Sequence, residues 1–147
     1  MRRNEVSTVR WDDGREDGSV VKLADQTIRV VGKGNKPRTV PIHPALQECL
    51  VQNQGLPGAW VIRSNGDHGI AEETIQAITK RLHPMYTPHD FRRTVATSLR
   101  RNGVDESVRN RILGWGPKDI FMRHYDHVAD LELHRGILRL YAADPLD

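Results

Sequence analysis

The segment His89-Asp90-Phe91-Arg92 carries an imidazole and a guanidinium three positions apart. Thr87 is a good N-cap residue and Pro88 fits the first helical position, so the sequence predicts that a helix begins here. His89 and Arg92 then share a face of its first turn, where free backbone N–H groups and the helix dipole favour an anion. A guanidinium can hold two phosphate oxygens, and an imidazole can move a proton near neutral pH. The pattern indicates a phosphate site, although surface residues and helix caps often show the same spacing.

Three further side chains stand in settings suited to phosphate chemistry. Lys33 lies between Gly32 and Gly34 in a predicted hairpin turn, from which a lysine can swing its ammonium into a neighbouring site. This turn lacks the Walker spacing and the Ser or Thr that follows it, which argues against a nucleotide site. Trp115 follows a Leu-Gly pair, and Tyr125 supplies a phenol at the end of a short predicted helix. Taken singly, the lysine is typical of a solvated turn and the aromatic residues are typical of internal packing.

The composition indicates one soluble globular domain. The chain has 147 residues, of which 37% are hydrophobic and 28% charged, and this length allows a buried core without covalent staples. Its one cysteine, Cys49, excludes an internal disulfide and favours a reducing, cytoplasmic compartment. No apolar run reaches the length of a membrane span and the amino terminus is polar, so neither a membrane nor a secretory signal is expected.

The charge distribution points to a polyanionic partner. The net charge is only +3, but residues 79–125 hold ten basic side chains against four acidic ones, which are Asp90, Asp105, Glu106 and Asp119. Such an imbalance is typical of a nucleic-acid footprint, and a solvated basic face is an equally open alternative. The ten basic residues are Lys80, Arg81, Arg92, Arg93, Arg100, Arg101, Arg109, Arg111, Lys118 and Arg123.

The periodicity of the sequence predicts an α+β fold that is mainly helical, with a small antiparallel three-stranded sheet near the amino terminus. The expected strands, rich in β-branched residues, cover 19–23, 27–31 and 38–42. A helix is expected to end within residues 2–10, before an acidic, glycine-rich loop. Further helices are expected at 44–51, 72–82, 88–102, 106–113, 118–125 and 131–141.

The chain resembles the tyrosine recombinases, or phage integrases, at five motifs that occur in the same order. Residues 2–13 resemble the first arginine motif, and residues 30–41 (VVGKGNKPRTVP) resemble the β-hairpin lysine motif. Residues 87–97 (TPHDFRRTVAT) resemble the His-x-x-Arg box. Leu113-Gly114-Trp115 and Tyr125-Asp126-His127-Val128 match the last two boxes, of which the second carries the nucleophile. Each motif is weak alone, but together they span nearly the whole chain and are specific.

The resemblance implies DNA cleavage and rejoining through a 3′-phosphotyrosyl intermediate, with no metal and no cofactor. Arg2 and Arg92 would clamp the non-bridging oxygens of the scissile phosphate. Trp115 would donate its indole N–H to a phosphate oxygen and shape the site by packing.

The resemblance also assigns the nucleophile and the proton transfers. Tyr125 would attack the phosphorus, and His89 would hydrogen-bond the phosphate and help to take the phenolic proton. Lys33 would protonate the departing 5′-oxygen, a role that suits a mobile ammonium better than a fixed guanidinium. The residues expected to contact DNA around this centre are Lys36, Arg38, Lys80, Arg81 and Arg93.

Domain organisation and partners follow from the same resemblance. Residues 1–147 are expected to form the catalytic domain, with the amino-terminal core-binding domain absent. Double-stranded DNA in the nucleoid is the expected partner. The chain is expected to bind it as a homo-oligomer, a tetramer, and without DNA the chain could be a monomer. The helix at 131–141 is expected either to dock into a neighbouring subunit or to fold back on its own domain. Two other hypotheses stay open, a truncated or inactive recombinase that only binds DNA and an unrelated helical protein with chance motifs.

Overall fold

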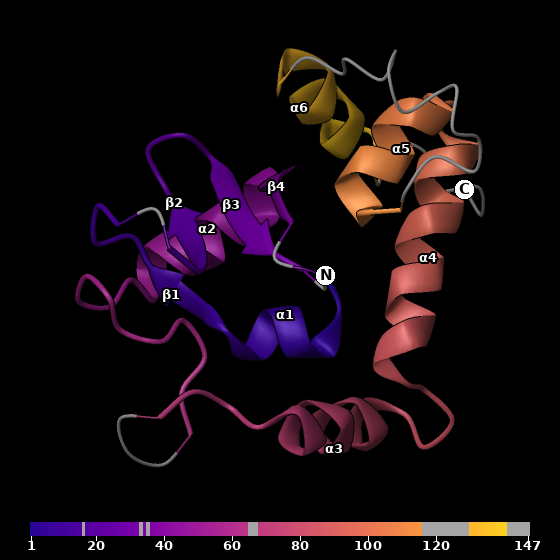
Figure 1. Cartoon of the computed structure of the whole chain (residues 1–147). Helices are drawn as coiled ribbons and strands as arrows, with labels where there is room; N and C mark the ends of the chain where they lie inside the picture. The colour runs from indigo at the N-terminus through magenta and orange to yellow at the C-terminus, as the bar shows by residue number, and fades with distance from the viewer. Residues whose placement is uncertain (16, 33, 35, 65–67, 116–129, 141–147) are drawn as a thin grey trace.

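The computed structural model describes the whole chain except residues 16, 33, 35, 65–67, 116–129 and 141–147. The strands of the described part are β1 (Val9–Trp11), β2 (Ser19–Lys22), β3 (Thr27–Val31) and β4 (Pro37–Pro41). Its helices are α1 (Arg3–Ser7), α2 (Pro44–Gln52), α3 (Glu72–Leu82), α4 (Pro88–Arg101), α5 (Glu106–Leu113) and α6 (Asp130–Leu138). In Figure 1 the sheet and α2 lie on one side of the molecule and α4, α5 and α6 lie on the other, with α1 between them and α3 below.

The sheet has four strands rather than the three predicted, in the order β1-β2-β3-β4. The three predicted strands form its antiparallel part. The extra strand, β1, pairs in parallel with β2, and its first two residues, Val9 and Arg10, are ones that the sequence assigned to the end of a helix. Val9 and Trp11 are buried and Arg10 between them is exposed, which is a strand period, but three residues are too few to reveal it. The predicted helix therefore shrinks to the five residues of α1.

The predicted helices have counterparts wherever the chain is described. The bounds of α3 and α5 are those predicted, and α4 begins at Pro88 behind its N-cap Thr87, also as predicted. The last helix begins one residue earlier than expected and ends at Leu138 instead of continuing to position 141. The helix predicted at 118–125 lies outside the described residues.

Two hydrophobic clusters build the core. The one in the sheet half (α1, β1–β4 and α2) contains Val9, Trp11, Val21, Ile28, Val30, Ile42 and Leu50. The one in the helical half (α4–α6) contains Leu99, Val104, Val108, Ile112, Leu133, Ile137 and Leu140. Val40 of β4 packs against both clusters, so this strand joins the two halves.

The helix α6 folds back on its own domain, which is one of the two arrangements expected for it. Leu133 and Ile137 are buried in the helical half. A Cβ atom at Gly136 would lie 2.7 Å from Cγ1 of Val108, so α6 and α5 are in close contact there. Leu138, the last residue of α6, is 54% exposed.

Candidate active site

Three of the six predicted catalytic residues meet at one pocket. It has a volume of about 290 Å³ and is lined by Arg2, His89 and Arg92. Its other lining residues are Met1, Arg3, Gln76, Thr87 and Pro88. Arg2 also borders a second hollow, of about 550 Å³, that reaches Gly32 at the start of the turn bearing Lys33. Arg2 therefore lies between the imidazole–guanidinium pair of α4 and the lysine hairpin.

The amino terminus of α4 is held by an interaction between Thr87 and Asp90. The hydroxyl and the backbone N–H of Thr87 both donate to Oδ2 of Asp90, at 2.7 and 2.9 Å. These two hydrogen bonds lower the pKa of the Asp90 carboxyl, which therefore stays ionised at the positive end of the helix dipole. Because the cap fixes the first turn, it also fixes the direction in which His89 and Arg92 project.

Arg92 is a buried cation whose guanidinium is only partly satisfied. The residue is 8% exposed, and its Nη2 donates to the carbonyl of Leu113 at the end of α5. Its Nη1 is buried and has no hydrogen-bond partner within the described part of the chain. Burial, and then the charge of Arg2, lower the pKa of Arg92, while Glu5 opposes that shift. A buried guanidinium with an unused donor beside a hollow is suited to receive an anion.

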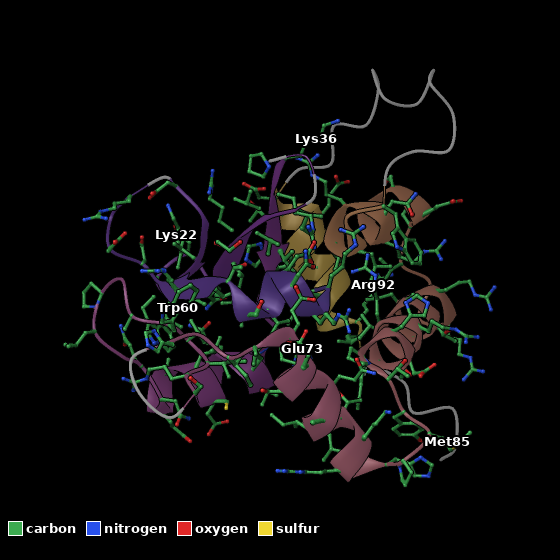
Figure 2. All side chains as sticks on the ribbon, turned by 60° about the horizontal axis from the view of Figure 1, so that its bottom comes forward. Lys22, Lys36, Trp60, Glu73, Met85 and Arg92 are labelled. Carbon is green, nitrogen blue, oxygen red and sulfur yellow. The ribbon has the colours of Figure 1, made fainter. Side chains whose placement is uncertain are left out.

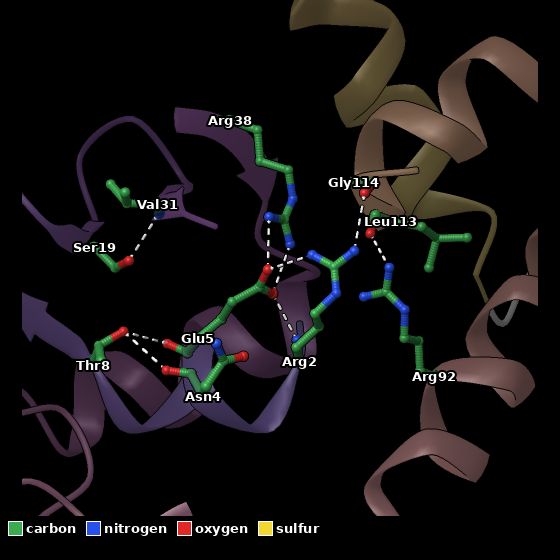
Figure 3. Close-up of polar contacts among 10 residues, drawn as sticks. All are labelled: Arg2, Asn4, Glu5, Thr8, Ser19, Val31, Arg38, Arg92, Leu113 and Gly114. Carbon is green, nitrogen blue, oxygen red and sulfur yellow. Dashed lines mark hydrogen bonds and ion pairs between the residues drawn. The ribbon is translucent and has the colours of Figure 1, made fainter. Parts of the chain in front are cut away.

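Figure 3 shows a cluster in which the carboxylate of Glu5 joins Arg2 and Arg38. Oε1 of Glu5 accepts from Nη1 of Arg2 and from Nη1 of Arg38, both at 2.9 Å. Oε2 accepts from the backbone N–H of Arg2 at 2.6 Å and from Nη2 of Arg38 at 2.8 Å. Glu5 is only 1% exposed, and burial raises its pKa, but these hydrogen bonds, led by those from Arg38, lower it to about 2. The carboxylate therefore stays ionised near neutral pH, where it is bonded to Arg2 and Arg38 and also interacts electrostatically with Arg92.

The sequence did not single out Glu5. An acid three positions after an arginine is typical of an exposed pair on a short helix. The signal that could have found it is Arg38, which sits in a strand that joins the core. A charge that faces the interior needs an opposite charge to meet it.

The residues predicted to contact DNA divide into two groups. The exposed group is Lys36, Lys80, Arg81 and Arg93. Figure 2 shows Lys36 at the rim of the molecule, on the turn between β3 and β4, whereas Arg92 lies inside, between α1 and α4. The side chain of Arg38 is only 10% exposed, and its guanidinium faces Glu5 rather than solvent.

Two predicted catalytic residues, Lys33 and Tyr125, lie outside the described residues, so their roles stay predictions. The turn that carries Lys33 is closed by a hydrogen bond from the N–H of Gly32 to the carbonyl of Lys36, at 3.2 Å. Tyr125 belongs to residues 116–129, which connect the end of the Leu-Gly-Trp motif to α6.

The Leu-Gly-Trp motif borders the site from the helical half. Gly114 ends α5 in the left-handed conformation, with φ 65°, and its carbonyl accepts from Nη2 of Arg2 at 3.4 Å. A Cβ atom at Gly114 would lie 2.6 Å from Nε of Arg38. Trp115 follows, 44% exposed, with its ring centroid 5.7 Å from Cζ of Arg92. The motif therefore contacts all three arginines of the site.

Gly114→Ala is expected to destabilise the fold by more than Gly103→Ala. Both glycines follow helices in the left-handed conformation, with φ 65° and 69°, so each alanine bears a backbone cost of about 1–2 kcal/mol. Only Gly114 adds a steric clash with Arg38, because no atom lies within 4 Å of a Cβ at Gly103. Urea unfolding of both variants measures the difference. Equal losses in the free energy of unfolding would show that the side chain of Arg38 can move away from the new methyl group without an energetic penalty.

The described residues provide arginines, not a metal cluster, at the pocket. In these ranges no three or more His, Cys, Asp or Glu side chains are grouped so that they could hold a metal ion. Among the helices of the same ranges, none combines the length and the apolar character needed to cross a bilayer.

The sequence is similar to that of curated recombinases. The sequence model of the phage integrase family matches residues 1–132. Tyrosine recombinase XerD of Lacticaseibacillus casei is 31% identical over 131 residues, which cover 78% of this chain and 42% of that protein. Tyrosine recombinase XerC of Pediococcus pentosaceus is 29% identical over 133 residues, which cover 78% of this chain and 41% of that protein. The chain thus spans less than half the length of these relatives.

The fold is similar to that of solved recombinase structures. The integrase from mycobacterium phage Brujita matches 100% of this chain and 48% of its own, with a TM-score of 0.73 at 23% identity. XerA recombinase matches over 91% of this chain and 51% of its own, with a TM-score of 0.65 at 25% identity. Because the family match covers most of the sequence and the fold agrees with it, the chain belongs to the phage integrase family.

Proposed function

We propose that residues 1–147 form the catalytic domain of a tyrosine recombinase, which cuts and rejoins duplex DNA through a 3′-phosphotyrosyl intermediate. The observation that carries the proposal is the buried, unused Nη1 of Arg92 beside a pocket that Arg2 and His89 also line. Membership of the phage integrase family supports the same reaction.

The scissile phosphate would bind between the two guanidinium groups. Nη1 of Arg92 offers a donor whose solvation is already lost, and the side chain of Arg2 is 44% exposed and keeps free donors. Preorganised donors of this kind stabilise the charge on non-bridging oxygens without reorganising during the reaction. Trp115 would add its indole N–H from the helical half. Because arginines stay protonated throughout, separate groups must move the protons.

In the proposed step the phenolic oxygen of Tyr125 attacks the phosphorus and forms a P–O bond, while the bond from phosphorus to the 5′-oxygen breaks. His89 accepts the phenolic proton, and Lys33 gives a proton to the departing 5′-oxygen. Rejoining reverses both transfers, as the 5′-hydroxyl attacks the phosphotyrosine. One phosphodiester bond is exchanged for another, so the cycle needs no external energy source.

Duplex DNA is the proposed partner, contacted around the pocket by exposed cations. These are Lys36, Lys80, Arg81 and Arg93. On DNA the chain would act as a homo-oligomer, a tetramer, within the nucleoid. Leu131 and Leu138 of α6 are 60% and 54% exposed, which leaves apolar surface for such an assembly. Binding without cleavage is the second candidate, because the chain spans less than half the length of its curated relatives.

Wild-type chain incubated with nicked suicide duplexes, randomised around the nick, is expected to form a covalent adduct that resists SDS. Loss of the short fragment beyond the nick prevents rejoining, so the phosphotyrosyl intermediate accumulates. Mass spectrometry should map the adduct to Tyr125, and Tyr125→Phe should form none. Tyr86→Phe is the matched control, since Tyr86 is 48% exposed and lies outside the pocket. An adduct that persists in Tyr125→Phe would contradict the proposal, and salt-sensitive binding without any adduct would favour the binding module.

A further inference from the structure

Arg38 lies where three structural elements meet. It belongs to β4, its guanidinium binds Glu5 of α1, and its side chain packs against Gly114 at the end of α5. A Cβ atom at Gly32, directly before Lys33, would also lie 3.4 Å from Nη1 of Arg38. One side chain thus contacts the first arginine motif, the base of the lysine turn and the Leu-Gly-Trp motif.

The side-chain hydrogen bonds to Glu5 are shared unequally between Arg38 and Arg2, whose backbone N–H also donates to Oε2. Arg38 gives one terminal nitrogen to each carboxylate oxygen, at 2.9 and 2.8 Å, which makes a bidentate ion pair. The side chain of Arg2 gives only Nη1, at 2.9 Å. Its Nη2 has a long 3.4 Å contact to the carbonyl of Gly114. Arg38 is therefore the main partner of Glu5, and Arg2 keeps donors for another anion.

Removal of Arg38 would leave Arg2 as the one cation of the described residues that is hydrogen-bonded to the carboxylate of Glu5. A buried carboxylate needs its hydrogen bonds, because an unpaired charge in the interior is strongly unfavourable. Arg2 would then turn both terminal nitrogens toward Glu5. An arginine engaged in this way offers fewer donors and less positive charge to the pocket.

We propose that Arg38 is a positioning residue for strand cleavage. It holds both carboxylate oxygens of Glu5 and lies against Gly32 and Gly114, so that the side chain of Arg2 stays available to the scissile phosphate. The inference rests on the proposed function. It differs from the direct DNA contact expected for Arg38 from the sequence, since the side chain is only 10% exposed and both of its terminal nitrogens are directed at Glu5. Lys36, on the same hairpin and exposed, keeps its expected DNA contact.

Arg38→Lys tests this role in the full chain, because lysine keeps the charge and most of the stem but cannot bind both oxygens of Glu5. On saturating suicide duplex we expect the single-turnover rate of adduct formation to fall by about tenfold or more. The slope of log affinity against log salt should stay at its wild-type value. Lys36→Gln is the matched control for a phosphate contact, and it should reduce that slope by about one unit.

A double variant supplies a measurement that a purely structural role would not move. In Arg38→Met the charged Glu5 draws Arg2 away, whereas Glu5→Gln in the same chain removes that attraction. We therefore expect Arg38→Met/Glu5→Gln to react several-fold faster than Arg38→Met alone, under conditions where circular dichroism shows both to be folded. If each substitution only damaged the structure, their rate losses would multiply, and the double variant would react more slowly than Arg38→Met.

Three results would overturn the inference. The first is a salt slope reduced by one unit in Arg38→Lys with a wild-type rate at saturation, which would make Arg38 a DNA contact. The second is a double variant slower than Arg38→Met. The third is an Arg38→Lys chain that matches a reactive wild type in both rate and slope. A wild type that forms no adduct would overturn the proposed function as well, so the two failures are distinguishable.

Discussion

Arg92→Gln is expected to lower the single-turnover rate of adduct formation on saturating suicide duplex by about 100- to 1,000-fold. Glutamine can still donate to the carbonyl of Leu113, which Arg92 contacts. It removes the charge and the unused Nη1, the group that would meet the phosphate. A donor that acts mainly on the transition state changes the rate more than the affinity, so the dissociation constant for DNA should change far less.

The matched control for this variant is Arg101→Gln. Arg101 is an exposed arginine in the last turn of the same helix, and it does not line the pocket. Its replacement removes the same charge from α4 and should leave the saturated rate near the wild-type value. An Arg92→Gln chain that stays folded and reacts within a few-fold of wild type would mean that the phosphate binds elsewhere.

Glu5→Ala is expected to lower the free energy of unfolding by about 3–5 kcal/mol, because it leaves a buried guanidinium without its counter-charge. The side chain of Glu5 is 1% exposed and that of Arg38 is 10% exposed, so bulk water cannot solvate the guanidinium of Arg38 in place of the lost carboxylate. Urea unfolding near neutral pH measures the loss. Glu48→Ala, at an exposed position of α2, is the control and should stay within about 0.5 kcal/mol of wild type.

Acid should reduce the difference in the free energy of unfolding between wild type and Glu5→Ala. The pKa of Glu5 is about 2 in the folded chain against an ordinary value of 4.5. Because the folded-state pKa is the lower one, the stabilisation by Glu5 is complete above about pH 4.5 and is lost as the pH falls through about 2. An equally large gap near neutral pH and near pH 2 would contradict the assignment of this carboxylate as an ionised partner of Arg38.

The elements that the sequence predicted well are those with local signals. Thr87 and Pro88 mark the start of α4, and Gly114 follows the last residue of α5, because caps and stops act within one helical turn. The antiparallel strands carry their own β-branched pattern. The strand β1 has no such local signal, since its pairing with β2 and the bridge from Arg10 to Trp60 exist only once distant segments meet.

The same distinction applies to the site. His89 and Arg92 could be paired from helical spacing alone, and Arg2 entered through the resemblance to a family. The role of Glu5 could not be read from the sequence, because its main partner, Arg38, lies 33 positions away and the burial of both depends on the folded sheet. Local sequence therefore supplies the pair on α4, whereas the charge balance around Arg2 is a product of tertiary structure.

The two core clusters have a consequence for how the phosphate site is divided. Arg2 and Glu5 belong to the sheet half, Arg92 to the helical half, and Val40 is the apolar side chain that packs against both clusters. Each half has its own hydrophobic interior and supplies one guanidinium of the pair. The distance between the guanidinium groups of Arg2 and Arg92 is therefore set by how the two halves pack together at β4. Neither half by itself contains both cations of the proposed phosphate site.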